Sequence, residues 1–210
     1  MLRGINFHYS RQGRKCYAFY MFRGGKCAGF VLVGGRSSRM GRDKALLRYK
    51  ETTLVKHVAH VVLEAAGSVV LVGRPERYGD LQLPVIADTW EDAGPLGGIH
   101  AALKSTTAEW NLIVACDMPA LTAPFLRGLL AGLEAAPDIL MPVGPSGKPE
   151  PLCAVYHRRS FAAMDAALQK GLRRITEAIA GLVVRYQPCA DGSPFANLNT
   201  PEQWLSHSDA

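Results

Sequence analysis

The densest chemical signal in the sequence is a glycine-rich segment with basic side chains, LVGGRSSRMGRDK, over residues 32–44. Glycines let backbone amides come close to an anion, and successive amides form an anion-binding nest, to which Arg39 and Lys44 add positive charge. The segment therefore predicts a cradle for a triphosphate. Its spacing is that of neither a Walker A loop nor a Gly-x-Gly-x-x-Gly loop, and a glycine-rich turn with solvated basic residues is the alternative interpretation. The glycines concerned are Gly34, Gly35 and Gly41.

Two aspartates come directly after apolar runs that are typical of buried strands. Asp117 follows residues 112–116, and Asp88 ends the sequence VIAD. Proteins usually hold Mg²⁺ by one or two carboxylates together with substrate phosphates, so we expect Asp117 to be a magnesium ligand. Arg39, Lys44 and Asp117 are thus the candidate catalytic residues. A turn or helix-capping role is the alternative for each aspartate, and for Asp88 the two interpretations stay open.

Three further segments bring polar or accessible groups to the ends of predicted elements. Gly94 begins GPLGG, a helix start so poor in side chains that a ligand can approach its amides; tight helix packing is the alternative. Glu150 lies in the rigid segment KPEPL, which is expected to carry exposed charge before a strand. Asn197 and Asn199 share one side of an extended segment and could bind a polar heterocycle. Helix capping is the alternative role for Asn199.

The strands and helices that position these groups can be predicted from the pattern of apolar residues. After residue 26, apolar runs alternate with helical patterns along the chain. Such alternation predicts a mainly parallel sheet with helices on both faces, whose ligands bind at the carboxyl ends of the strands. Strands are expected at residues 28–33, 68–72, 85–87, 112–116, 139–143, 152–156 and 182–186. Helices are expected at residues 52–66 with a threonine cap, 95–104, 123–135, 160–169 and 172–180.

The chain of 210 residues is 48% apolar and 20% charged, which is ordinary for a globular domain. Its net charge of +6 resides in residues 1–26, which hold six basic residues and no acid; the remainder is neutral. We interpret residues 1–26 as a basic, aromatic-rich leader that is disordered or not native, and residues 27–210 as one domain. The alternative interpretation is that this leader binds single-stranded nucleic acid.

Several classes of protein are not expected from the sequence. There is no apolar run long enough to span a membrane, and residues 1–26 lack the apolar core of a signal peptide. The five cysteines are widely spaced, without a Cys-x-x-Cys motif, and predict reduced thiols in a cytoplasmic protein. We therefore expect neither a membrane nor nucleic acid among its partners.

The segments LVGGRSSRMGRDK, GPLGGI, CDMP and NLNTPE occur in this order in molybdenum cofactor guanylyltransferases, which the chain resembles over residues 27–205. The resemblance implies a three-layer Rossmann-like nucleotidyltransferase fold. It also implies transfer of GMP from GTP to molybdopterin cofactor, with release of pyrophosphate and with Mg²⁺ as cofactor. Family positions that contact GTP match Leu32, Val33, Gly34, Lys44, Asp88 and Asp117, the last also holding magnesium. Positions associated with the pterin match Asn197 and Asn199.

Two features of the resemblance bear on specificity. Val33 stands where many family members have alanine, whereas the Gly34–Gly35 pair favours guanine, because cytidine-using relatives carry alanine then glycine there. A cytidylyl- or sugar-phosphate nucleotidyltransferase is the alternative within the same chemistry. A non-catalytic nucleotide-binding protein that delivers cofactor is the alternative from another class. Transient contact with molybdoenzymes or their chaperones is a further expectation.

Overall fold

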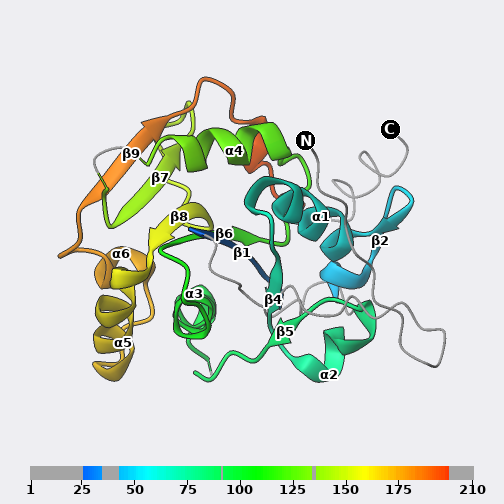
Figure 1. Ribbon diagram of the computed structural model, residues 1–210, viewed down its shortest axis with the longest axis horizontal. Helices are drawn as coiled ribbons and strands as arrows, with labels where there is room; N and C mark the ends of the chain where they lie inside the picture. The colour runs from blue at the N-terminus through cyan, green and yellow to red at the C-terminus, as the bar shows by residue number, and fades with distance from the viewer. Residues whose placement is uncertain (1–25, 35–42, 91, 134–135, 199–210) are drawn as a thin grey trace.

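The computed structural model describes residues 26–34, 43–90, 92–133 and 136–198. Within these residues, seven strands form one sheet in the order β5-β4-β1-β6-β8-β7-β9 (Figure 1). Six of them run in the same direction, and β8 alone is antiparallel to its neighbours β6 and β7. The strands are β1 (Cys27–Leu32), β4 (Val70–Val72), β5 (Val85–Ile86), β6 (Trp110–Ala115), β7 (Ile139–Val143), β8 (Cys153–His157) and β9 (Val184–Pro188).

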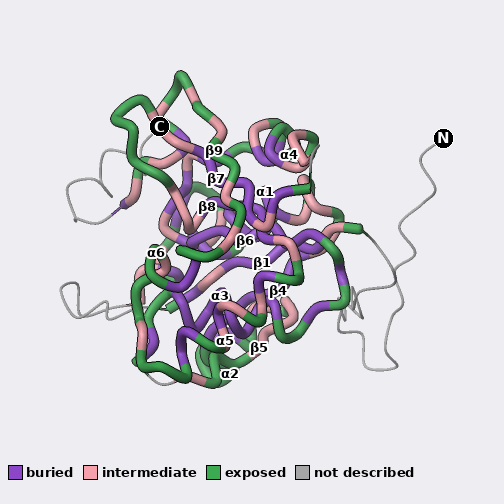
Figure 2. The backbone as a smooth tube through the Cα atoms, turned by 90° about the vertical axis from the view of Figure 1, so that its left-hand side faces the viewer, coloured by how far each residue is buried: buried purple, intermediate pink, exposed green. Residues whose placement is uncertain are grey.

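The strands β1 and β6 form the centre of the sheet and pair in parallel along six residues, from Cys27 opposite Trp110 to Leu32 opposite Ala115. All six residues of β6 are buried, because helices cover both faces of the sheet. This explains the nearly continuous apolar runs of these two strands in the sequence. Figure 2 shows the same arrangement, with buried central strands and a largely exposed β9.

Helices cover both faces of the sheet (Figure 1). On one face, α1 (Leu54–Ala66) and α4 (Ala123–Ala131) pack together, and Leu112 and Val114 of β6 join their core. On the other face lie α3 (Gly94–Ser105), α5 (Phe161–Gln169) and α6 (Ile175–Ala178), which share a core with Ile113. Alternate residues of one strand thus serve opposite layers. The expected three-layer α/β architecture is confirmed.

Residues 48–53 depart from expectation, because they form a small hairpin of β2 (Arg48–Tyr49) and β3 (Thr52–Thr53). The helix predicted from residue 52 therefore begins only at Leu54. A threonine does occupy the N-cap position, as expected, but it is Thr53, and its side chain makes no capping hydrogen bond. The β-branched pair Thr52–Thr53 is extended and pairs with β2, which removes it from the helical stripe.

Other differences concern element ends and short helices. The helix expected at residues 123–135 ends at Ala131, followed by Gly132, and the one expected at 172–180 is a single turn, α6. Short helices that the sequence did not indicate are η1 (Lys44–Leu46), α2 (Pro75–Tyr78), η2 (Gly79–Leu81), η3 (Arg158–Ser160) and η4 (Ser193–Phe195). None of the helices in the described residues is long and apolar enough to cross a lipid bilayer. Residues 1–25, most of the predicted leader, lie outside the described residues.

Candidate active site

The carboxyl ends of the parallel strands are tied together by backbone hydrogen bonds just beyond the sheet. The amide of Val33 donates to Val72 O at 2.9 Å, and the amide of Cys116 donates to Leu32 O at 3.1 Å. A third bond joins the amide of Gly73 to Ile86 O at 2.9 Å. The segments that follow β1, β4, β5 and β6 therefore start from one edge of the sheet, as the sequence predicted.

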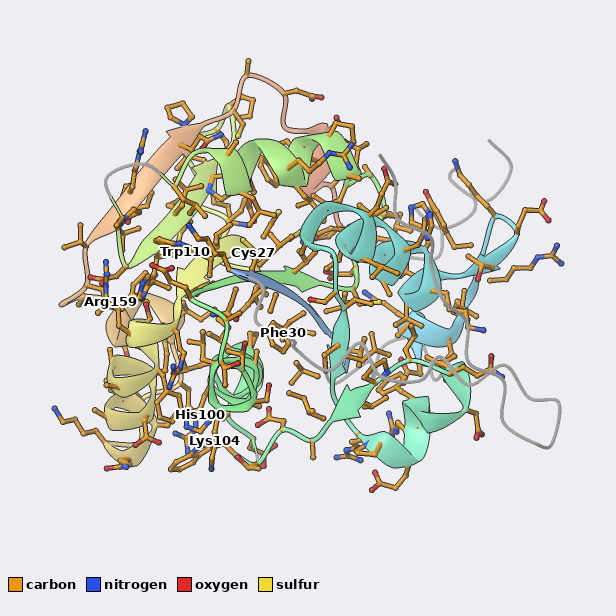
Figure 3. All side chains as sticks on the ribbon, in the orientation of Figure 1. Cys27, Phe30, His100, Lys104, Trp110 and Arg159 are labelled. Atoms are coloured by element: carbon orange, nitrogen blue, oxygen red, sulfur yellow. The ribbon has the colours of Figure 1, made fainter. Side chains whose placement is uncertain are left out.

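Figure 3 helps to locate this edge, because it labels Cys27 and Trp110 at the starts of β1 and β6. These two residues mark the opposite end of the sheet. The candidate site lies at the other end of the same two strands, beyond Leu32 and Ala115.

The glycine-rich segment enters the site through Val33 and Gly34. The φ angle of Gly34 is +114°, a left-handed backbone conformation that favours glycine. Among the described residues, none but the chain neighbours of Gly34 has an atom within 4 Å of where a Cβ at this position would lie. Residues 35–42 of the segment lie outside the described residues, among them the predicted site residues Gly35, Arg39 and Gly41.

Lys44 and Asp117 meet at the backbone of Leu198. The ammonium group of Lys44 donates a hydrogen bond to Leu198 O at 2.9 Å, and the amide of Leu198 donates to Asp117 O at 3.1 Å. A single residue from the end of the described chain thus joins the lysine after the phosphate segment to the aspartate after β6. The arrangement brings together two of the three predicted catalytic residues.

The Asp117 carboxyl group experiences two opposing influences. Its burial raises the pKa above the ordinary value for aspartate, and the positive charge of Lys44 lowers it. Burial makes a lone carboxylate costly, so a cation beside it is stabilising. Lys44 supplies one positive charge, and a carboxylate of this kind also suits a divalent ion.

The residues at this edge fit Mg²⁺, which takes hard oxygen ligands and keeps several waters or phosphate oxygens. The described residues contain no cluster of three or more His, Cys, Asp or Glu side chains placed to hold a metal. A site for Mg²⁺ does not need such a cluster, because one carboxylate and substrate phosphates suffice. Asp117, as a half-buried carboxylate at the end of β6, is the residue that would hold it.

Asp88 lies against the first turns of α3. A Cβ on Gly97 would come within 2.7 Å of Asp88 Oδ2 and 2.9 Å of Oδ1, so the glycine makes room for this carboxylate. Oδ1 also accepts a hydrogen bond from the amide of Trp90 at 3.0 Å, which is a turn role. Burial raises the pKa of Asp88, while the Trp90 amide and His100 lower it.

The glycines of α3 serve more than one purpose. Gly94 begins the helix with a φ angle of +59°, and a Cβ there would meet no atom of the described residues within 4 Å. Gly98 instead lies tight against the sheet, since a Cβ would be 3.2 Å from Leu32 Cδ2. The start of the helix therefore combines a glycine with few described neighbours and a glycine that packs closely on β1.

The acceptor candidates come from the other half of the sheet. Glu150 precedes β8, and its side chain is only 14% exposed, whereas Lys148 at 3.9 Å is 73% exposed. The expectation of exposed charge in KPEPL is thus wrong for Glu150, because the turn folds that side chain inward. Burial raises the pKa of Glu150, and Lys148 lowers it.

Asn197 is the other described acceptor candidate. It comes one residue before Leu198, so it lies beside the junction of Lys44 and Asp117. Its Oδ1 atom is buried without a hydrogen-bond partner among the described residues. A buried amide oxygen of this kind is a ready acceptor for a ligand. Asn199 lies outside the described residues.

Two groups at the site were not singled out from the sequence. The carbonyl of Leu198 is a backbone group, and no side-chain pattern indicates it. Asp43 forms a capping bond to the Ala45 amide at 3.1 Å and accepts a hydrogen bond from Tyr78. Its acidic side chain directly before Lys44, in the sequence RDK, is the only local signal that could have drawn attention to it.

The fold resembles that of solved nucleotidyltransferases. The molybdopterin-guanine dinucleotide biosynthesis protein A of Archaeoglobus fulgidus superimposes with a TM-score of 0.73 and is 28% identical, covering 87% of this chain and 97% of that one. The 2-C-methyl-D-erythritol 4-phosphate cytidylyltransferase of Thermus thermophilus shares the fold with a TM-score of 0.64 at 16% identity, covering 86% and 96%. The architecture is that of a Rossmann-like nucleotidyltransferase.

Sequence comparison narrows this class. The model of the MobA-like NTP transferase domain matches residues 29–183. A probable molybdenum cofactor guanylyltransferase of Bacillus mycoides is 33% identical over 86% of this chain and 94% of its own length. A molybdenum cofactor guanylyltransferase of Vibrio atlanticus is 32% identical over 82% and 91%. The chain belongs to the MobA-like NTP transferase family and is a nucleotidyltransferase.

Proposed function

We propose that the chain transfers GMP from GTP to molybdopterin cofactor, forming the guanine dinucleotide cofactor and releasing pyrophosphate. The observation that carries the proposal is the junction at Leu198, where Lys44 and Asp117 meet the segment of Asn197. A transferase must bring a nucleotide and an acceptor to one point. Here the Lys44 ammonium group and the backbone carbonyl of Asp117 both bond Leu198, the residue after Asn197, whose buried amide oxygen has no partner among the described residues.

The donor nucleotide binds at the carboxyl ends of β1, β4 and β6 in this proposal. Gly34 and Gly94 let its phosphates approach backbone amides, and Lys44 supplies a fixed positive charge. Asp117 holds Mg²⁺, which when bound neutralises charge on the phosphates. Asp88 faces the same space from the end of β5 and contacts the nucleotide. Leu32 and Val33, at the end of β1, line the nucleotide site beside these residues.

The acceptor binds beside residues 197–198. Asn197 orients the pterin, and the Glu150 carboxylate accepts a hydrogen bond from one of the pterin N–H groups. An oxygen of the terminal phosphate of molybdopterin then forms a bond to the α-phosphorus of GTP. The bond from that phosphorus to the bridging oxygen breaks on the opposite side, and pyrophosphate leaves with both electrons. Lys44 stabilises the charge that develops on the departing group. Arg39 and the amides of Gly35 and Gly41 contribute in the same way.

Pyrophosphate release is the direct test. With Mg²⁺ and molybdopterin cofactor present, GTP is expected to give release at least about tenfold faster than CTP, ATP or UTP, because the pocket selects one base. Omission of either molybdopterin or Mg²⁺ should abolish release. Faster turnover of CTP would instead identify a cytidylyltransferase. Tight GTP binding without release under any condition would identify a cofactor-delivery protein.

The proposal extends to the setting of the reaction. Residues 27–210 act as one nucleotidyltransferase domain, of which β1 is the first strand. A cytoplasmic location suits both the GTP supply and the free thiols at Cys27, Cys116, Cys153 and Cys189. Because the product is a cofactor of molybdoenzymes, the chain contacts those enzymes or their chaperones transiently when it hands the product over.

A further inference from the structure

The carboxylate of Asp43, the residue before Lys44, is held by three groups. Its Oδ1 accepts a hydrogen bond from the amide of Ala45 at 3.1 Å, and its Oδ2 accepts one from the Tyr78 hydroxyl at 2.7 Å. The guanidinium of Arg77 lies 3.6 Å from Oδ2. The proposed reaction uses none of these groups directly, so their role needs a separate explanation.

Tyr78 brings a second part of the chain to this point. Its side chain is buried, at 1% exposure, and Asp43 is the acceptor for its hydroxyl. The ring packs on the edge of the sheet that carries the site: a Cβ on Gly73 would lie 3.1 Å from Tyr78 Cε2 and 2.5 Å from Val33 O. Burial and the hydrogen bond to Asp43 raise the pKa of Tyr78, so the hydroxyl keeps its proton and remains a donor.

Of the two contacts to Asp43 Oδ2, the hydrogen bond from Tyr78 is the stronger. Arg77 has a half-exposed side chain, and ion pairs in contact with solvent contribute little. The Tyr78 side chain is buried and its hydroxyl donates to a carboxylate oxygen, which is the stronger kind of hydrogen bond. Asp43 is thereby anchored to α2, close to Val33, at the same time as it caps the first turn of η1.

We propose that Asp43 and Tyr78 are a positioning pair that sets where the Lys44 ammonium group reaches. A lysine side chain is a point charge on a flexible stem, so its placement depends on a fixed backbone. The pair fixes residues 43–45 against the end of β1, and from there Lys44 extends to Leu198 O, 2.9 Å away. The inference rests on the proposed role of Lys44 at the nucleotide phosphates.

A double-mutant cycle on nucleotide binding tests this inference. Tyr78→Phe keeps the ring but removes the hydroxyl, and is expected to weaken nucleotide binding about tenfold, the value of a hydrogen bond to a charged group. In a Lys44→Ala background the same change should cost less than about twofold, because its effect passes through the lysine. Equal losses in the two backgrounds, or no loss in either, would overturn the proposal. Tyr186→Phe, on exposed β9, is the matched control and should leave binding unchanged.

A second pair of variants covers the case in which Tyr78→Phe fails to fold. Asp43→Ala removes both acceptor atoms and should weaken binding about tenfold. Asp43→Asn keeps one oxygen acceptor for Ala45 and an amide group that donates to Tyr78, and should restore binding to within about threefold of wild type. If Asp43→Asn weakened nucleotide binding as much as Asp43→Ala does, the charge of Asp43, and not its anchoring, would be what matters.

The choice of nucleotide separates this inference from the proposed function. The cycle is run by calorimetry with whichever of GTP, CTP, ATP and UTP binds wild type most tightly in the presence of Mg²⁺. A preference for CTP would refute guanylyl transfer but still yield a valid cycle for Asp43 and Tyr78. Lack of binding by all four nucleotides would overturn both.

Discussion

The two halves of the sheet provide the site in different ways. The half formed by β5, β4, β1 and β6 contributes parallel strand ends, glycines and backbone amides from closely spaced turns. In the half formed by β8, β7 and β9, the proposed acceptor residues are Glu150, which precedes β8, and Asn197, which follows β9. In the proposed site, the donor half therefore combines backbone groups with the side chains of Lys44, Asp88 and Asp117, whereas the acceptor half relies on side chains alone.

The strands of the two halves also differ in how deeply they are buried. Each residue of β6 is buried, whereas β9 at the edge of the sheet leaves Tyr186 52% exposed. A phosphate site made of backbone amides constrains few side chains but requires accurate strand ends. An acceptor site made of side chains on loops can be altered one residue at a time. The following predictions test this contrast.

The largest effect is expected for Asp117→Asn, on the donor side. The change keeps the size of the side chain but removes the charge of the proposed metal ligand, so turnover should fall at least about 100-fold. The residual activity should require more Mg²⁺. A magnesium titration of turnover measures both. A curve that superimposes on that of wild type after scaling would make Asp117 a turn residue only.

Gly97→Ala tests the donor half through packing. The new Cβ would lie 2.7 Å from Asp88 Oδ2 and must displace that carboxylate. Overpacking costs about 1–3 kcal/mol, and if Asp88 binds nucleotide, affinity for GTP should fall about tenfold. Gly128→Ala in α4 is the control, since a Cβ there meets no atom of the described residues within 4 Å and should stabilise the helix. Loss of stability with unchanged GTP affinity would assign Asp88 a turn role alone.

Asn197→Ala tests the acceptor half and should leave the donor half intact. We expect the KM for molybdopterin to rise about tenfold while GTP affinity stays the same, because one hydrogen bond to the acceptor is lost. Stability should not fall, since the change removes a buried oxygen that has no partner in the described chain. The control is Asn111→Ala: its Oδ1 is likewise unsatisfied, but its Nδ2 bonds Ala108 O and Tyr156 O at 3.3 Å. That variant should lose stability without a change in KM.

The smallest effect on activity is expected at Asp138, whose carboxylate bonds Arg159 and the Val183 amide next to β7 and β9. The hydrogen bond from Arg159 and that from Val183 lower the pKa of Asp138. A lowered folded-state pKa stabilises the protein above the unfolded value near 4, and this contribution disappears as pH falls through the folded value.

Asp138→Ala should therefore reduce the free energy of unfolding by about 1 kcal/mol at pH 7 and by much less near pH 3. Activity at neutral pH should stay within about twofold of wild type, because the residue is remote from both substrates. Urea denaturation at the two pH values is the measurement, with exposed Asp80→Ala as the control. The same loss at both pH values would contradict the assigned ion pair.

The sequence predicted the central strands well, for a physical reason. Strands β1 and β6 are buried on both faces and therefore appear as short apolar runs bounded by glycine or aspartate. The strand expected at residues 139–143 matches β7 residue for residue. The hairpin of β2 and β3 was missed, because two residues per strand are too few to establish a period of two.

The candidate site was only partly accessible from sequence. Lys44 and Asp117 could be placed at one edge because parallel strands deliver their carboxyl ends there. The contact of Lys44 with Leu198 could not be predicted, since it joins residues 154 positions apart through a backbone carbonyl. The inward orientation of the Glu150 side chain could not be predicted either, because the prolines on either side indicate a rigid backbone but not the direction in which the side chain points.

The link between Lys44 and Leu198 has a consequence for the order in which the molecule forms. During synthesis, strands β1, β4, β5 and β6 are complete once residue 115 has emerged, and their neighbouring pairs can assemble early. The bond to Leu198 closes a loop spanning 154 positions and has to wait for the end of the described chain. A polypeptide that stops short of residue 198 therefore retains the strands of the donor half but never closes the junction of Lys44 and Asp117 at Leu198.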